Sequence, residues 1–526
     1  MARLTGLDGA FLALESPTTH LHIMGTMVFD PSDLPGGLTF RRIRSLVGER
    51  VPLVPPFRMR LVEVPFGLQH PALVDDPEFD LDYHVRRLSL PAPGGTAELT
   101  RLVADIASRP LDRARPLWEF HVVEGLESGR VGLVSKVHHA IVDGVSGAEV
   151  LAAFLDLTPD PTPRPLFGDE PSSRPGNGTG ASRTAGDHES AEDRGPGPRG
   201  GVDGGPYGRP DGGPDGWTPA GLAGDIDQLR QSLGDLPGQI EAVARTVAQT
   251  VRTARTLTGR NREVGGTLPP APFQAPQTSI NAAISPHRRV AFADLPLVDV
   301  RRVRDAFGGT MNDIVLAVTA GALRTFFARR GEDPDTSLVA LVPVSVRSEA
   351  EQGTLGNRVS ALLVSLATGV ADPVVRLGQI RDGMRAAKEQ SRAIGSDVYS
   401  AWAEAAFPAI ATRVSRLVTN LRLFDHVAPL FNVVVSNVPG PDVALHLAGA
   451  RMASLHPLGP IVEGAGVNVT VFSYLDSVHV GIQACWDLVP DVDVLGTAME
   501  EALAELVAEV VRRERPVPWW HAELPA

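Results

Sequence analysis

The stretch Lys136–Gly147, which reads KVHHAIVDGVSG, decides how the surrounding chain folds. The apolar run of Val131–His139 predicts a buried strand that leads into the two histidines. Asp143-Gly144 then predicts a turn, after which the pattern favours a helix. The histidine pair therefore stands where a strand gives way to a loop, a common place for reactive side chains.

The two adjacent histidines, His138 and His139, cannot both face one cleft, because neighbouring residues of an extended chain point to opposite sides. A neutral imidazole, with an ordinary pKa of about 6.5, is suited to take a proton from an alcohol near pH 7. We therefore expect one of the pair to act as a general base. Asp143, four residues after His139, either orients the imidazole or pairs with an arginine to hold the loop. A metal site built on this pair is not expected, because the two side chains diverge.

Composition excludes several classes of protein. The chain has 526 residues, of which 43% are hydrophobic and 21% charged, as in globular proteins with more than one core. A formal net charge of -13 argues against nucleic acid as a partner, because phosphate binding needs clustered Lys and Arg. The single cysteine, Cys485, excludes an internal disulfide and a cysteine-based zinc site. We expect it to be a buried apolar residue.

Membrane and export signals are not expected in this sequence. No run of about 18 apolar residues is free of charge. Asp8 and Gly9 interrupt the apolar N-terminal stretch, so it does not read as a signal peptide. We therefore expect a cytoplasmic protein that meets membranes only at a surface.

One change in composition divides the chain. Residues 168–219 hold 15 Gly and 8 Pro. They contain too few apolar side chains to offset the entropy that the chain would lose on ordering. This predicts a disordered linker, so we expect an N-terminal domain over 1–163 and a C-terminal domain over 276–526. The intervening 164–275 combines the linker with an amphipathic helical segment at 222–258. That segment either packs on the protein or lies on anionic lipid with three arginines nearby: Arg245, Arg252 and Arg255.

Strand-like and helix-like segments alternate elsewhere, which predicts an α/β protein. Beside the strand that ends at the histidines, strands are expected at 339–346 and 431–435, with a hairpin formed by 468–474 and 478–484. Helices are expected at 40–49, 97–108, 147–157, 311–329, 373–392 and 491–513.

The spacing His138-His139-x-x-x-Asp143-Gly144 is similar to the HHxxxDG motif of CoA-dependent acyltransferases. More specifically, the chain resembles the bacterial wax ester synthase/acyl-CoA:diacylglycerol acyltransferase family. The resemblance covers both halves, because further blocks follow in the family's order: Leu7–Leu12, His20–Met24, Pro116–Trp118, Asn312-Asp313, Pro343–Arg347 with Gly356-Asn357, and Ser436–Pro441. The Gly/Pro-rich segment departs from the family pattern and looks like an insertion between the halves.

This resemblance implies two chloramphenicol acetyltransferase-like domains with a tunnel between them, joined by a long linker and a crossover helix. It implies transfer of a long acyl chain from acyl-CoA to diacylglycerol, forming triacylglycerol, or to a fatty alcohol, forming a wax ester. In the related motif the second histidine, here His139, is the base, and Asp143 is usually structural. The reaction needs no metal, no covalent acyl-enzyme and no cofactor, with acyl-CoA as co-substrate.

Other motif residues have two interpretations. Asn312 lies in the first turn of a helix that Thr310 and Asp313 cap. Its amide either stabilises the thioester oxyanion or only completes the helix start. Ser436 and Asn437 either line the tunnel or serve a turn. The remaining motif positions are expected to line the tunnel or support the motif: Gly144, Pro116, Trp118 and Asp313.

Two alternative functions stay open. The HHxxxDG motif also occurs in condensation-type enzymes of peptide or glycopeptide assembly, although this chain carries no carrier domain. A non-catalytic lipid-binding relative is the other alternative, against which the intact His139, Asp143 and Asn312 argue. The sequence leaves the choice between diacylglycerol and fatty alcohol open, because pocket width decides it. Either acceptor requires contact with a membrane or lipid droplet.

Overall fold

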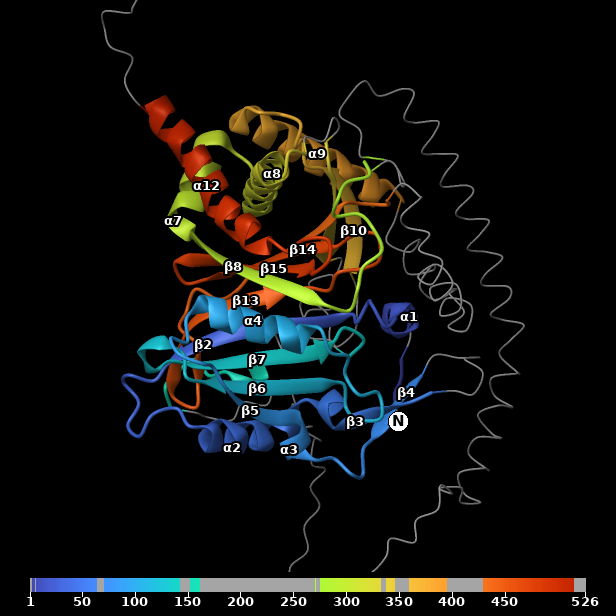
Figure 1. Ribbon diagram of the computed structural model, residues 1–526, viewed down its shortest axis with the longest axis vertical. Helices are drawn as coiled ribbons and strands as arrows, with labels where there is room; N and C mark the ends of the chain where they lie inside the picture. The colour runs from blue at the N-terminus through green and yellow to red at the C-terminus, as the bar shows by residue number, and fades with distance from the viewer. Residues whose placement is uncertain are drawn as a thin grey trace, which may run out of the picture.

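The computed structural model shows two stacked six-stranded sheets with most of the helices on their outer sides (Figure 1). The structure describes residues 2–4, 6–63, 71–141, 152–160, 270, 275–332, 337–345, 359–394 and 429–514. Several sequence-based predictions lie outside these residues: the 168–219 linker, the 222–258 helical segment, Asp143 and Gly144.

The first sheet contains the strand that carries the histidine motif. Its strand order is β12-β13-β2-β7-β6-β5, and most neighbours are antiparallel. Four strands come from the first half of the chain: β2 (His22–Asp30), β5 (Val85–Ser89), β6 (Trp118–Glu124) and β7 (Val131–His138). The other two come from the second half, namely β12 (His446–Leu447) and β13 (Ala450–Leu458). The first sheet thus draws strands from both sides of the predicted linker, and the 1–163 and 276–526 boundaries stay predictions.

The second sheet has the order β10-β9-β11-β14-β15-β8 and is built from the second half of the chain. Its strands are β8 (Arg288–Pro296), β9 (Val339–Ser345), β10 (Val359–Ser365), β11 (Val433–Val438), β14 (Val467–Tyr474) and β15 (Ser477–Cys485). A small third sheet, of order β1-β4-β3, contains β1 (Ala2–Arg3), β3 (Met59–Val62) and β4 (Ala72–Asp75).

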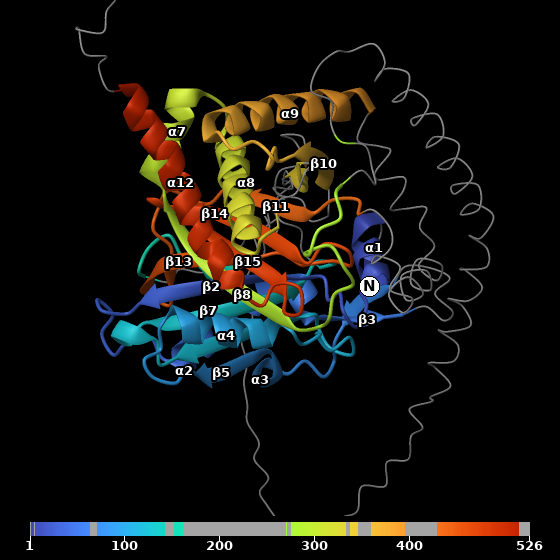
Figure 2. The same ribbon diagram turned by 45° about the horizontal axis from the view of Figure 1, so that its top comes forward.

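Helices cover the sheets and close the cores. Four of them lie on one face of the second sheet (Figure 2): α7 (Leu297–Phe307), α8 (Met311–Arg329), α9 (Pro373–Ile394) and α12 (Val492–Glu514). The first sheet is flanked by α2 (Phe40–Arg50), α3 (Leu81–His84) and α4 (Thr96–Ala107). Since α4 packs on the first sheet and also against Val290 and Phe292 of β8, it joins the two layers. The short α1 (Gly6–Leu14) lies near the end of β7 (Figure 1).

Most predicted elements are confirmed within one to three residues. The predicted helix 311–329 coincides with α8, whose start is fixed by a capping box between Thr310 and Asp313. The hairpin of β14 and β15 is also confirmed. The predicted end of helix 147–157 is wrong, because Leu155–Leu157 are not helical. Asp156 instead forms an isolated bridge with His446 and a buried ion pair with Arg50, at 2.6 Å.

One helix among the described residues, α8, is long and apolar enough to cross a membrane by length and composition alone. Most of it is buried inside the protein, where it packs against α9 and α12. A buried core helix satisfies the same criteria, so α8 is explained by its packing.

Candidate active site

The histidine pair lies at the end of β7, as the sequence predicted. Val131–His138 is buried along its whole length, because its apolar side chains pack into two separate core clusters. His138 is 1% exposed, whereas His139, the first residue after the strand, is only partly buried. The two side chains therefore have different surroundings, and they also have different neighbours.

His138 is held by polar partners on both sides of its ring. Its Nδ1 accepts a hydrogen bond from the backbone N–H of Ala140 at 3.0 Å. In a neutral imidazole the proton is then on Nε2, which faces the carboxylate of Glu15 at 3.6 Å. His22 lies directly opposite His138 in the β2–β7 register, with ring centroids 5.8 Å apart. These contacts fix the orientation of a buried ring.

Glu15 is the charged residue at the centre of this cluster. Its Oε1 lies 3.9 Å from Nε2 of His22, and its Oε2 accepts hydrogen bonds from Nε and Nη2 of Arg113, at 2.9 and 2.5 Å. Burial alone would raise the pKa of Glu15, but His138 and Arg113 bring that pKa below its ordinary value. Glu15 is therefore a buried carboxylate that stays ionised beside the motif.

His139 presents its ring to a different environment. Phe11 of α1 stacks on it, with ring centroids 4.1 Å apart and an interplanar angle of 25°. The backbone N–H of His139 donates to the carbonyl of Leu21 at 3.0 Å. Leu21 has a φ of 48°, in the left-handed region that costs a non-glycine residue about 1–2 kcal/mol. A strained residue thus holds the backbone of His139, as is common at functional sites.

The Pro116–Trp118 block supports the motif from the neighbouring strand. The carbonyl of Leu117 accepts a hydrogen bond from the N–H of His138 at 3.0 Å. Trp118 is fully buried, donates from Nε1 to the carbonyl of Phe57 at 2.8 Å and stacks on His84. This block therefore anchors the first sheet beside the histidines.

Asn312 and Asp313 lie at the start of α8, on the helical side of the second sheet. Asp313 is buried, and its carboxylate accepts from the N–H and the hydroxyl of Thr310 at 2.7 and 2.8 Å. Within the described part of the chain, no hydrogen bond joins Asn312 to either motif histidine. The capping role of Asp313 is confirmed, whereas an oxyanion role for Asn312 stays a prediction.

Ser436 and Asn437 belong to β11 rather than to the turn that follows it. They pair with Thr470 and Val471 of the parallel strand β14, and both are partly exposed. The turn itself needs Gly440, because a Cβ there would come within 2.1 Å of the carbonyl oxygen of Ser473. Ser436 and Asn437 thus contribute to the pairing of β11 with β14. A role for them in lining a tunnel stays a prediction.

Buried basic groups lie where the two halves meet, close to the motif. Arg288 of β8 donates to the backbone carbonyl of Thr18, and burial lowers the pKa of its guanidinium to about 10. Lys136, two residues before His138, donates to the carbonyls of Ile106 and Arg109, and burial lowers its pKa to about 8. A cavity of about 10 Å³, roughly the room for one water, opens between residues of both halves, including His20, His22, Arg288 and Gln483.

The sequence pattern did not single out Glu15, His22 or Arg113 as site residues. Glu15 and Arg113 are 98 positions apart, and neither belongs to a motif with a spacing of its own. The one available signal is that Glu15 follows the Leu7–Leu12 block and His22 lies inside the His20–Met24 block of the resemblance. The structure brings both blocks to the histidine pair.

Comparisons with known proteins identify the family. The family model of the wax ester synthase/diacylglycerol acyltransferase catalytic domain matches residues 4–315, and that of the family's C-terminal domain matches 355–507. A candidate diacylglycerol O-acyltransferase of Mycobacterium tuberculosis is 35% identical over 509 residues, covering 96% of this chain and 90% of the relative. A second candidate from the same organism is 34% identical over 529 residues, covering 98% and 99%.

Solved structures give the same fold. The wax ester synthase/diacylglycerol acyltransferase of Marinobacter aquaeolei is 25% identical, covers 97% of this chain and 100% of its own, and superposes with a TM-score of 0.63. The first condensation domain of the calcium-dependent antibiotic synthetase is 15% identical, covers 97% and 96%, and gives a TM-score of 0.54, a likeness of fold alone. The two-domain acyltransferase fold is thus confirmed, and the chain belongs to the wax ester synthase/diacylglycerol acyltransferase family.

Proposed function

We propose that this protein transfers a long acyl chain from acyl-CoA to the hydroxyl of diacylglycerol, forming triacylglycerol, and that His139 is the general base. The observation that carries the proposal is that the two adjacent histidines at the end of β7 have different surroundings. His138 is buried, with both ring nitrogens directed at neighbouring groups, whereas His139 is partly exposed on the loop side of the strand. Family membership supplies the acyl-CoA and the acceptor hydroxyl.

The chemistry follows from an imidazole at this position. His139 takes the proton of the acceptor hydroxyl while its oxygen attacks the thioester carbonyl carbon. The tetrahedral intermediate then collapses, the carbon–sulfur bond breaks, and the CoA thiolate leaves with the proton from the imidazolium. No covalent acyl-enzyme is needed, because the acceptor attacks the thioester directly. In the same scheme Asp143 holds the loop, and the amide of Asn312 stabilises the oxyanion.

Glu15 supports the reaction through its charge. The ionised carboxylate lies 3.6 Å from Nε2 of His138 and 3.9 Å from Nε2 of His22, and so orients both buried rings. Its effect on His139 is indirect, through the orientation of His138 and the strand end that both residues share. Phe11 restricts the His139 ring from the opposite side. Together these groups hold the base in place before substrate arrives, which reduces the entropy lost on reaching the transition state.

The substrates place the enzyme at a lipid surface. Diacylglycerol and triacylglycerol are nearly insoluble, so a cytoplasmic enzyme takes them from a membrane or lipid droplet. The 222–258 segment, with Arg245, Arg252 and Arg255, is the proposed attachment element. Co-sedimentation with anionic liposomes tests this, by comparing the wild type with the triple alanine variant. Unchanged binding of the variant rules out this element, and absence of binding by the wild type points to delivery of lipid by a partner.

The decisive assay offers the purified protein a long-chain acyl-CoA together with diacylglycerol and a fatty alcohol. Release of CoA and the identity of the lipid product are both measured. Triacylglycerol formation dependent on acyl-CoA is the expected result, with wax ester as the product of the alternative acceptor. Release of CoA without a lipid ester, or no reaction with either acceptor, would contradict the proposal.

A further inference from the structure

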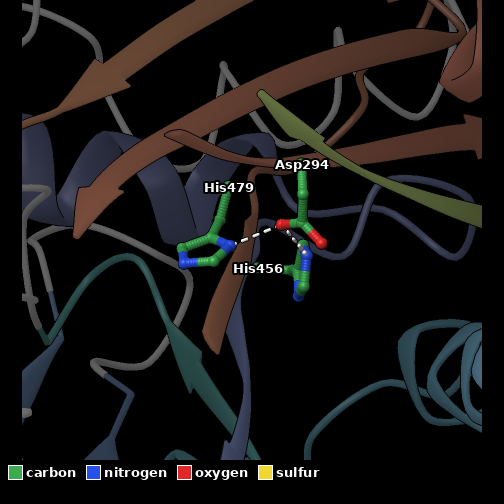
Figure 3. A group of neighbouring side chains, drawn as sticks. All are labelled: Asp294, His456 and His479. Carbon is green, nitrogen blue, oxygen red and sulfur yellow. Dashed lines mark hydrogen bonds and ion pairs between the residues drawn. The ribbon is translucent and has the colours of Figure 1, made fainter. Parts of the chain in front are cut away.

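A second group of histidine and carboxylate side chains lies away from the motif, between the two sheets (Figure 3). Asp294 of β8, His456 of β13 and His479 of β15 point toward one another. Oδ1 of Asp294 lies 3.0 Å from Nε2 of His456 and 2.5 Å from Nδ1 of His479. These atoms all lie within 4.8 Å of one another. In the register of the first sheet His456 stands opposite Thr26, roughly 13 Å along β2 from His22.

The three side chains are held by strand pairing rather than by flexible loops. His479 stands directly opposite Asp294 in the antiparallel register of β15 and β8. His456 reaches them from the other sheet, because β13 sits tightly on β15. A Cβ at Gly481 would come within 1.8 Å of the carbonyl oxygen of Pro457, so the backbones touch at that point. Phe292 stacks on the His456 ring at 4.3 Å and fixes its plane.

We propose that Asp294, His456 and His479 form a binding site for a divalent transition-metal ion, with zinc as the ion that fits best. Two imidazole nitrogens and one carboxylate oxygen are a common ligand set for Zn²⁺, leaving a fourth position for water. Ligands of a tetrahedral zinc lie about 3.4 Å apart, given metal–ligand distances of about 2.1 Å. The carboxylate thus moves outward by less than about 1 Å, which its exposed position allows.

The approach to the site is open on one side. The two histidines are 6% and 5% exposed, whereas the Asp294 side chain is 56% exposed. Asp294 also lines a surface cavity of about 1060 Å³ beside the Leu475–Ser477 turn, through which an ion and its water reach the ligands.

The expected role of the ion is to join the two six-stranded sheets. Its ligands come from β8 and β15 of the second sheet and from β13 of the first. Nδ1 of His456 has no hydrogen-bond partner among the described residues, so the site lacks the outer support that the tightest sites have. We therefore expect micromolar rather than nanomolar affinity. The acyl-transfer reaction is still expected to need no metal, because the proposed zinc site lies away from the histidine motif.

The test is a zinc titration of the full-length, tag-free protein after chelator treatment, followed by calorimetry. One equivalent of Zn²⁺ is expected to bind, with a melting temperature raised by about 2 °C or more at 100-fold excess over Kd. Asp294→Asn is expected to weaken binding at least about 100-fold, more than the loss of an outer-shell partner usually costs. Asp476→Asn is the matched control, because Asp476 lines the same cavity without approaching the histidines.

Two outcomes would overturn the proposal. One is a wild-type protein that binds no zinc at 100 µM, roughly the upper end of a micromolar site. The three side chains would then only hydrogen-bond to one another across the sheets. The other is equal binding by Asp294→Asn and Asp476→Asn. Urea unfolding of metal-free Asp294→Asn checks that the variant is folded, and His479→Gln provides a second test of the ligand set. Since the readout is binding, its result is independent of whether the protein transfers acyl groups.

Discussion

Two clusters of histidine and carboxylate side chains in this protein use the same residue types for different ends. At the end of β7, Glu15 contacts His138 and His22, and the neighbouring His139 remains partly exposed. Between the sheets, Asp294 contacts His456 and His479, both of which are buried within strands. The first cluster borders a loop and can present an imidazole to substrate. The second lies between the sheets, with its two histidines buried and Asp294 exposed, so it can hold the two sheets together or bind an ion.

The largest effect is expected inside the first cluster. His139→Ala should lower the rate of acyl transfer by about 10²–10⁴, the usual cost of removing a general base. His138→Ala should cost less, because His138 orients the strand end without touching the reacting atoms. The measurement is the initial rate of CoA release for both variants, with melting curves to show that they fold. Near-normal activity in His139→Ala together with complete loss in His138→Ala would reverse the two assignments.

A smaller effect is expected at the carboxylate. Glu15→Gln should lower kcat by about tenfold, less than the loss of the base itself, because the charge beside His138 and His22 is removed. The matched control is Glu63→Gln, since Glu63 contacts the same Arg113, at 3.0 Å, but is exposed. Glu15→Asp should recover part of the rate. Equal losses in the Glu15 and Glu63 variants would show that Arg113, rather than the histidines, explains the role of Glu15.

The structure also predicts how stability depends on pH. Burial lowers the pKa of His20, His22 and His84 below their ordinary value in the folded protein. Unfolded histidines therefore bind protons that the folded ones do not, and the free energy of unfolding should fall as pH drops below about 6.5. The depressed pKa of Glu15 adds a further loss at lower pH, below about 4.5.

Urea unfolding at pH 8, 6.5 and 5.5 measures this dependence. His22→Gln, which removes the histidine whose pKa is lowered furthest, should flatten the curve between pH 6.5 and 5.5. A stability that stays constant over this range in the wild type would show that these histidines are not buried in their neutral form.

The sequence predicted elements with local signals well. The boundaries of α8 follow from a capping box and an apolar pattern that are both local, and the turn at Leu475 and Asp476, one residue earlier than the sequence suggested, joins neighbouring strands. The position of His139 followed from a strand that runs into a turn. The two clusters of histidines and carboxylates could not be predicted from local signals, because their residues meet through pairing between distant segments. Glu15 meets Arg113 across 98 positions, and His456 meets Asp294 across 162.

The crossing of β13 into the first sheet was equally inaccessible to sequence reasoning. Ala450–Leu458 pairs with β2, more than 400 positions earlier in the chain, and nothing local to either strand specifies that partner. Asn312 lies in the first turn of the capped helix α8. Its position on the helical side of the second sheet depends on the same pairing between distant segments.

The smallest effect is expected from the Gly/Pro-rich segment. Deleting residues 172–216 should leave folding and activity largely intact, because the segment has few apolar residues and the cost of closing a loop depends weakly on its length. The melting curve and the acyl-transfer rate of the deletion variant check this. Aggregation, or loss of a cooperative transition, would show that the segment contributes to the folded structure.

Chemical rescue tests the central claim most directly, since it separates a base from a residue that shapes the site. Imidazole and related small bases are added to His139→Ala and to His138→Ala, and acyl transfer is measured against base concentration and base pKa. We expect partial recovery in His139→Ala that increases with the pKa of the added base, and no recovery in His138→Ala. Recovery in His138→Ala, with none in His139→Ala, would contradict the assignment of His139 as the base.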